Sequence, residues 1–394
     1  MKNYYLIYEK IDIGGIETLI WRMAMYLKEN NNITIICREI STEMKDTFKA
    51  HGLCWIETRK WNMKNILRDY LSHRNSIYIL YMYEDFLNLQ VVLSGKWKEN
   101  KCLYYCVHPQ HIQILEKKIG IRNYFNNIIS LFTKFYMDER NLLFMDSETL
   151  NSILNYYSIN GNYSKLIYPL PFSVNKNYKK YNNHSEYFNI LTIARADFPF
   201  KGYMLGMVDG AKKLLDQYPF ISYTFISYGE DYNKLEAKIN ELTVSQKERV
   251  LLINGTSPEK LVLYYENASL FIGMGTTILE AANYQIPCII AKAYSNDFLS
   301  IGTFDCNPMD IGNMSKKGID GNKQIEDILA LDSKQYMDLT KKTKRKLIEH
   351  YDINLIMKKI EDIQINNHCI SPSGFKKIIL KLILEYKHIK YRNR

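Results

Sequence analysis

Short apolar runs alternate with amphipathic stretches through the first half of the chain. The first run, YYLIY, is rich in strand-forming residues and is soon followed by a pair of glycines. Residues 16–29 then place apolar side chains at the three- and four-residue spacing of a helix. Further apolar runs predict buried strands at 33–37, 76–83, 102–108 and 141–147. This order of strand and helix predicts a parallel sheet with helices on both faces.

The pattern changes over 160–188, where Pro, Asn, Lys and Tyr replace the periodic spacing, and we interpret this stretch as an interdomain connection. Beyond it the alternation restarts. It predicts strands at 189–194, 221–228, 249–254, 268–273 and 287–291, with helices between them. The sequence therefore predicts two successive α/β domains with a cleft between them, and ligands in such sheets bind at the carboxyl ends of the strands.

Composition agrees with this picture. The chain has 394 residues, a length for two or three domains, and 46% hydrophobic with 24% charged residues excludes wholesale disorder. No apolar run is long enough to predict a transmembrane helix, and the N-terminus lacks the pattern of a secretory signal. Seven scattered cysteines predict reduced thiols in a cytosolic protein rather than a metal site or disulfides.

The positive charge gathers at one end of the chain. The net charge is +10, and residues 375–394 hold seven Lys and Arg against one acid, so the other 374 residues carry only +4. This distribution disfavours a nucleic-acid binder. Apolar side chains recur at helical spacing in the same segment: Phe375, Ile378, Ile379, Leu380, Leu382, Ile383, Leu384 and Tyr386. We expect an amphipathic helix that binds an anionic membrane surface, with packing on the protein as the alternative.

Two loops of the first half carry candidate chemistry. The first strand leads into Gly14 and Gly15, which let the backbone approach a phosphate or a sugar hydroxyl; a tight turn alone explains them equally well. The spacing is not GxGxxG, which disfavours a dinucleotide-dependent oxidoreductase. His108 follows the strand at 102–107 and can donate to a sugar hydroxyl or transfer a proton, although a structural histidine is the plainer interpretation.

The second half carries a pair of cations after a strand. Arg195 ends the strand at 189–194, and Lys201 follows six residues later across a loop that contains Pro199. Arg offers a bidentate fork and Lys a point charge, so the pair can clamp one diphosphate. The next strand, at 221–228, ends in Gly229, Glu230 and Asp231.

A glycine-rich turn follows the strand at 268–273. The residues Gly273-Met274-Gly275-Thr276-Thr277 lie between a strand and a helix, and we expect their amides to form an anion cradle at the helix N-terminus. We place Glu280 in the first turn of that helix, where its carboxylate can accept hydrogen bonds from the vicinal diol of a ribose. The plainer interpretation is a Glu that compensates the helix dipole.

In order and spacing, these segments resemble the GT-B glycosyltransferases, in particular the retaining group usually numbered family four. The resemblance rests on GGIE, ARADFPFKG, YGEDYNKLE and INGTSPEKLVLYYENASLFIGMGTTILEAANYQIPCIIA, and it is strongest over 189–291. It implies two Rossmann-like parallel-sheet domains facing a cleft. The implied boundaries are an acceptor-binding domain at 1–170, a linker at 171–188, a domain that binds the nucleotide sugar at 189–365 and the basic tail at 366–394.

The resemblance also implies roles for individual residues. His108, Arg195 and Lys201 would be catalytic, with His108 near the donor sugar and the two cations on the donor diphosphate. The implied donor-binding residues are Gly15, Glu230, Gly273, Gly275, Thr276, Thr277 and Glu280. No metal ion or other cofactor is implied, because side-chain cations and a helix N-terminus can stabilise the leaving diphosphate.

One position departs from the family pattern. The family has a Glu eight residues before the one that Glu280 matches, and this chain has Ile272 there. The departure favours a non-catalytic GT-B partner subunit that stabilises another transferase, whereas Arg195, Lys201 and Glu280 favour an active enzyme. A nucleotide-sugar epimerase is a third alternative, but it needs several cleft carboxylates and few candidates occur.

We therefore expect a retaining, metal-independent hexosyltransferase that moves a sugar from a nucleotide-diphosphate sugar to a lipid-linked or oligosaccharide acceptor. The richness in Tyr, Lys, Asn and Ile is typical of AT-rich bacterial genomes, in which such enzymes commonly assemble capsule or exopolysaccharide. We expect a cytoplasmic protein held at the inner face of the cell membrane by 375–394. Residues 114–136 are a second candidate for membrane contact, with packing on the protein as the plainer alternative.

Overall fold

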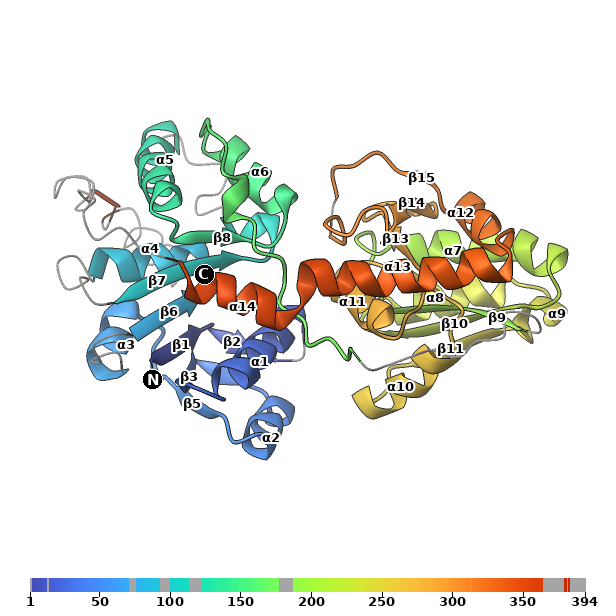
Figure 1. Cartoon of the computed structure of the whole chain (residues 1–394), viewed down its shortest axis with the longest axis horizontal. Coiled ribbons are helices and arrows are strands. Elements are labelled where there is room, and N and C mark those ends of the chain that lie inside the picture. The colour runs from blue at the N-terminus through green and yellow to red at the C-terminus, as the bar shows by residue number, and fades with distance from the viewer. Residues whose placement is uncertain are drawn as a thin grey trace. The chain divides into compact units, whose positions relative to one another are not determined.

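The computed structural model describes residues 2–12, 14–70, 76–92, 100–112, 122–176, 187–312, 314–363, 379–380 and 382. The chain divides into two compact units, which Figure 1 shows with their helices and strands labelled. The first unit comprises 1–171 with 353–394, and the second comprises 172–352. Each unit contains its own sheet of parallel strands, so the predicted α/β fold class is confirmed.

The first unit is built on a six-stranded parallel sheet of order β5-β3-β1-β6-β7-β8. Its strands are β1 (Asn3–Ile7), β3 (Asn32–Cys37), β5 (Cys54–Glu57), β6 (Ser76–Leu80), β7 (Lys101–Cys106) and β8 (Leu142–Phe144). The short strands β2 (Lys10–Ile11) and β4 (Glu39–Ile40) pair with each other. The helices are α1 (Gly15–Leu27), α2 (Thr42–Ala50), α3 (Met63–Tyr70), α4 (Tyr83–Val92), α5 (Arg122–Asp138), α6 (Ser147–Tyr156) and α14 (Ile353–Glu361), with 3₁₀ turns η1 (Pro109–Ile112) and η2 (Ser164–Leu166).

Alternating side chains of the central strands build two separate cores in this unit. Tyr5 and Ile7 of β1 face one core, whereas Tyr4 and Leu6 face the other, as the two-residue period of a strand requires. Helices cover both faces of the sheet, as predicted. The strand predicted at 76–83 ends earlier, because β6 stops at Leu80 and α4 follows directly.

The second unit has a seven-stranded sheet of order β11-β10-β9-β12-β13-β14-β15. Its strands are β9 (Phe188–Arg195), β10 (Ile221–Tyr228), β11 (Val250–Asn254), β12 (Leu270–Gly273), β13 (Cys288–Ala291), β14 (Leu299–Thr303) and β15 (Ile319–Asp320). The last two run antiparallel to their neighbours and were not predicted. The helices are α7 (Tyr203–Gln217), α8 (Tyr232–Asn240), α9 (Val244–Lys247), α10 (Pro258–Asn267), α11 (Thr276–Asn283), α12 (Gly321–Leu329) and α13 (Ser333–Tyr351).

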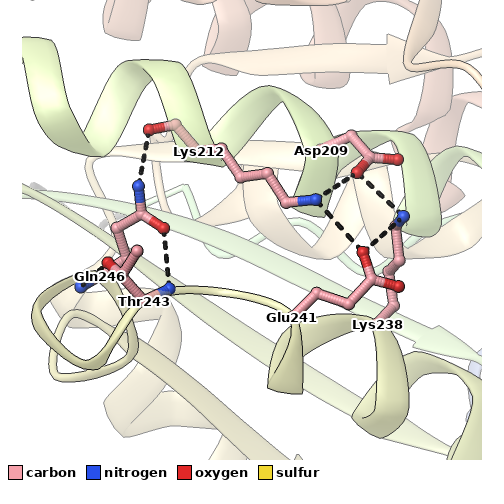
Figure 2. A network of polar contacts seen from close by, with 6 residues as sticks. All are labelled: Asp209, Lys212, Lys238, Glu241, Thr243 and Gln246. Atoms are coloured by element: carbon pink, nitrogen blue, oxygen red, sulfur yellow. Dashed lines mark hydrogen bonds and ion pairs between the residues drawn. The ribbon is translucent and has the colours of Figure 1, made fainter.

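Polar contacts join α7 to α8 and α9, as Figure 2 shows. The ammonium of Lys238 lies 2.9 Å from Asp209 and 3.0 Å from Glu241, and that of Lys212 lies 2.9 Å and 3.2 Å from the same two carboxylates. These ion pairs are partly exposed and contribute little stability. Gln246 is buried, and its side-chain amide donates to the Lys212 carbonyl at 3.1 Å, which holds α9 against α7.

Helix α14 belongs to the first unit, although we expected the second domain to extend from 189 to 365. Figure 1 shows α14 in orange-red among the blue elements of the N-terminal part. The buried residues of this helix join the core that contains α1: Ile353, Ile356, Met357 and Ile360. The Lys101 ammonium donates to the carbonyls of Glu361 and Ile363, which satisfies acceptors left free at the helix end. The boundary between the two units therefore lies near 352, because the first unit buries the apolar face of α14.

A buried lysine holds the start of the second unit against its helices. Lys344 of α13 is 6% exposed, and its ammonium donates to the carbonyl of Asn175 at 2.7 Å. It also donates to the carbonyl and the side-chain oxygen of Asn283, at the end of α11, at 2.8 Å each. Burial lowers the pKa of Lys344 to about 8, so the ammonium form predominates at neutral pH. Its three N–H donors then match three oxygen acceptors.

We expect Lys344→Met to lower the free energy of unfolding by about 2–3 kcal/mol, because a buried ammonium and its three hydrogen bonds to partly buried oxygens are lost. Chemical denaturation followed by circular dichroism measures the change. Lys342→Met on the same helix is the matched control, since Lys342 is exposed, and it is expected to change the stability by less than about 0.5 kcal/mol. Equal stability of the two variants would contradict the assigned role.

The two candidate membrane segments are partly used for packing. In the tail, Leu380 is buried in a core of the first unit, whereas Leu382 is 57% exposed. Ile379 is partly buried against the same core, and the other residues of 366–394 lie outside the described part of the chain. In the second candidate, 114–136, the described apolar face of α5 is buried: Ile128, Ile129, Phe132 and Tyr136. That face is used by the core, as the plainer alternative predicted. None of the described helices is long and apolar enough to cross a membrane.

Candidate functional site

The strand order determines where each sheet opens at its carboxyl edge. In the second unit β9 lies between β10 and β12, so the connections that follow β9 and β12 leave in opposite directions. Such a switch point leaves a crevice in which ligands of open parallel sheets bind. The loop after β9 carries Arg195 and Lys201, and the turn after β12 carries 273–277. Two of the segments predicted to contact the donor therefore flank the switch point of the second sheet.

The two cations of the first loop differ in their surroundings. The side chain of Arg195 is 58% exposed, and its guanidinium lies 2.9 Å from the Asp197 carboxylate. Lys201 is half-buried; burial, with a smaller contribution from Arg195, lowers the pKa of its ammonium to about 8. Among the described residues, no carboxylate lies within 4.0 Å of this ammonium. Lys201 thus has no direct ion pair with a described carboxylate, although the Asp197 carboxylate nearby partly offsets the fall in its pKa.

Close backbone packing determines the path of this loop. A Cβ atom added to Gly202 would lie 2.4 Å from the side-chain oxygen of Asn296 and 2.8 Å from the carbonyl of Ser295. Only glycine therefore fits beside the segment that follows β13. The amide of Tyr294 also donates to the carbonyl of Phe200 at 3.0 Å, so the two loops support each other.

The turn after β12 offers fewer free amides than the sequence predicts. Gly275 adopts a φ of 69°, which favours glycine, but its amide donates to the carbonyl of Ile311 at 2.6 Å. The amides of Thr276 and Thr277 begin α11 and have no hydrogen-bond acceptor within the described segments. An anion at this helix end would therefore meet these two amides, whereas Gly275 shapes the turn.

Glu280 does not lie in the first turn of α11. The helix begins at Thr276, because Gly275 occupies the N-cap position, and this places Glu280 in the second turn. Its carboxylate is thus too far along the helix to compensate the first-turn amides. Helical spacing puts Glu280 on the same face as Thr276 and Thr277.

Ile272 lies in a core and not in a loop. It is the third residue of β12, is fully buried and packs in the main apolar cluster of the second unit. Position 272, eight residues before Glu280, therefore lies in the strand and not in the turn that follows it. The family's other Glu therefore has no counterpart at this position.

Glu230, which we expected near the donor, is exposed just beyond β10 and makes no hydrogen bond or ion pair with a described residue. Its neighbour Asp231 accepts a hydrogen bond at 2.7 Å from the amide of Phe198, which lies in the loop between Arg195 and Lys201. The sequence analysis assigned no role to Asp231, since the contact joins residues that are far apart along the chain.

In the first unit, the glycine pair lies beside an acidic side chain. Gly14 is the N-cap of α1, and a Cβ added to it would lie 2.5 Å from a carboxylate oxygen of Glu17, whereas Gly15 faces open space. Burial raises the pKa of Glu17, and hydrogen bonds from the backbone partly offset this effect. The helix N-terminus thus holds a carboxylate of its own chain, which disfavours an external anion there.

His108 forms a pair with His111 after β7. Their ring centroids lie 5.1 Å apart, and the Nδ1 atom of His111 is buried and has no hydrogen-bond partner among the described residues. Burial lowers the pKa of His108, and burial together with His108 lowers that of His111 to about 4. Both rings are neutral at neutral pH, so His108 can donate to or accept from a hydroxyl but adds no charge. His111 lies in the same loop as His108, but the sequence pattern offers no reason to select it; only the structure shows that its ring is buried beside His108.

No group of three or more His, Cys, Asp or Glu side chains that could hold a metal ion occurs within the described ranges.

No protein-family model matches the sequence, and no curated protein matches it. Solved structures do. A glycosyltransferase from Rickettsia africae is 15% identical, with a TM-score of 0.63, over 98% of this chain and 99% of the other. HepE from Anabaena in complex with UDP-glucose is 12% identical, with a TM-score of 0.60, over 92% of this chain and 99% of the other. The lipopolysaccharide outer core galactosyltransferase WaaB is 16% identical, with a TM-score of 0.56, over 92% and 99%.

At identities of 12–16%, the structural similarity supports the fold alone. It extends over both units, and each unit has the strand order and the helix layers of a Rossmann-like domain. The chain therefore has the GT-B fold.

Proposed function

We propose that this protein is a glycosyltransferase that binds a nucleotide-diphosphate sugar at the carboxyl edge of its second sheet. The observation that carries the proposal is the half-buried Lys201 ammonium, which has no carboxylate partner among the described residues and lies in a loop at the switch point. Arg195 and the amides of Thr276 and Thr277, which have no acceptor among the described residues, flank the same switch point. Together they supply positive charge and N–H donors for a diphosphate.

The chemistry follows from these groups. When the bond between sugar and diphosphate breaks, negative charge develops on the leaving diphosphate, and preorganised donors stabilise it. Glu280 shares a helix face with the two threonines and is suited to a ribose diol. Structures of HepE contain UDP and UDP-glucose, and this makes UDP the first nucleotide to test.

The remaining features stay predictions. His108, as a neutral imidazole in the first unit, would contact a sugar hydroxyl of donor or acceptor. A retaining, metal-independent reaction, a lipid-linked or oligosaccharide acceptor and a role in bacterial surface polysaccharide rest on the sequence resemblance. So does a cytoplasmic protein attached to the membrane through 375–394, of which Leu380 is committed to the protein core.

The alternative is a non-catalytic partner subunit, which is favoured by Ile272 standing where the family has a Glu. Ile272 is a fully buried core residue of β12, so this position supplies no carboxylate to the site. The departure from the family pattern therefore stands, and Arg195, Lys201 and Glu280 remain the residues that favour an active enzyme.

Binding of UDP measured by isothermal titration calorimetry tests the proposal, and its pH dependence identifies Lys201. The ammonium is charged below its pKa of about 8, and a bound diphosphate favours the charged form. Affinity for UDP should therefore fall as the pH rises through about 8, approaching about tenfold per pH unit. Lys201→Met should bind UDP more weakly at neutral pH and lose this dependence. Absence of UDP binding, or the same pH profile in both proteins, would count against the site.

A further inference from the structure

Asp231 occupies a capping position but does not cap. It is the N-cap residue of α8, where an Asp side chain normally accepts from an amide of the first helical turn. Here the side chain makes no capping hydrogen bond and is only 17% exposed. The Asp231 carboxylate therefore contacts groups other than the backbone amides of α8.

Those contacts lie in the cation loop, which comprises residues 195–201. One carboxylate oxygen of Asp231 accepts from the amide of Phe198 at 2.7 Å, and the other lies 2.7 Å from the Lys234 ammonium. The backbone adds two bonds, from the Asp231 amide to the Ala196 carbonyl at 3.4 Å and from the Ala196 amide to the Tyr228 carbonyl at 2.7 Å. The middle of the loop is thus tied to the turn after β10.

The same turn also supports the stem of Arg195. Gly229 has a φ of 110°, and a Cβ added to it would lie 2.8 Å from Cγ of Arg195 and 3.0 Å from the carbonyl of Ala196. Any larger residue would displace the stem. Gly229 therefore packs against the loop at Arg195 and Ala196, and Asp231 bonds to it at Phe198.

We propose that Asp231 is a positioning residue for the cation loop, and that it sets the places of Arg195 and Lys201 before a diphosphate arrives. The inference rests on the proposed function, since it assigns a role within that site. Asp231 carries a negative charge near an anion site, but Lys234 neutralises it, and neither Arg195 nor Lys201 lies within 4.0 Å of its carboxylate. The hydrogen bond to Phe198, rather than the charge, is the active element.

Three variants separate these contributions. Asp231→Ala removes the acceptor for the Phe198 amide, Asp231→Asn keeps an oxygen acceptor without the charge, and Lys234→Ala removes only the ion pair. Affinities for UDP and for inorganic pyrophosphate are measured by calorimetry, and amide exchange of residues 196–201 is measured by mass spectrometry without ligand. We expect Asp231→Ala to weaken both ligands about tenfold and to speed the exchange, because the Phe198 amide loses its acceptor and the loop loses its support. Asp231→Asn and Lys234→Ala should stay near wild type in both measurements.

Each outcome decides one question. Equal affinities and exchange in Asp231→Ala and wild type would overturn the positioning role, and so would equal losses in the Ala and Asn variants, since the charge would then matter. Wild-type protein that binds neither UDP nor pyrophosphate would overturn the proposed function instead. In that case the exchange data still show whether Asp231 holds the loop. Melting temperatures of all variants identify any that fail to fold.

Discussion

Replacing Lys201 with alanine is expected to lower the turnover of a UDP-sugar about a hundredfold, with the fold retained. The ammonium is half-buried and forms no ion pair within 4.0 Å with a described carboxylate, so it can pair directly with the leaving diphosphate. Loss of one such preorganised contact raises the barrier by about 2–4 kcal/mol. Release of UDP from UDP-glucose in a coupled assay measures the effect.

Arg195→Ala should show a smaller loss, about tenfold, because its guanidinium is more than half exposed and already pairs with Asp197. Lys213→Ala on α7 is the control, since its side chain is 76% exposed and pairs with Glu326. It should leave turnover unchanged. Near-normal turnover of both the Lys201 and the Arg195 variants would remove these residues from the mechanism.

Ile272→Glu is expected to prevent stable folding of the second unit rather than to create activity. Ile272 is fully buried in β12, so the introduced carboxylate loses its hydration and finds no charge partner in an apolar cluster. A loss of about 4 kcal/mol or more is a large part of the stability of a typical domain. Thermal unfolding followed by circular dichroism measures it. The deficit should shrink at low pH, because burial raises the pKa of the new carboxyl and its neutral form is less costly to bury.

Two further variants serve as controls for this substitution. Leu251→Glu, at a position of the same sheet that is 50% exposed, should change the stability by less than about 1 kcal/mol. Ile272→Val should lower it by about 1 kcal/mol. Transfer activity gained by Ile272→Glu, in a protein that melts like the wild type, would contradict the expected unfolding and would support the non-catalytic alternative.

Local patterns were enough to predict the class of fold. Period-two and period-3.6 spacing located most strands and helices of both sheets, because burial on one face of an element imposes that spacing directly on the sequence. The same patterns identified strand ends, and in a parallel sheet these all lie at one edge. Arg195, Lys201 and the turn at 273–277 could be proposed on that ground alone.

Contacts between distant segments could not be predicted in this way. The sequence lists β9, β10, β11 and β12 in order, but only the sheet shows that β9 lies between β10 and β12. The hydrogen bond between Asp231 and Phe198 crosses two strand ends, and α14 packs with α1 at the other end of the chain. Spacing within a segment carries no information about such partners.

By itself, the sequence determined two α/β halves, their strand ends and the cations placed there. The tertiary structure alone decided that Ile272 is a core residue and that Lys201 is a half-buried cation. The physical reason is the same in each case. Burial and pKa depend on which atoms surround a side chain, and most of those atoms come from elements remote in sequence.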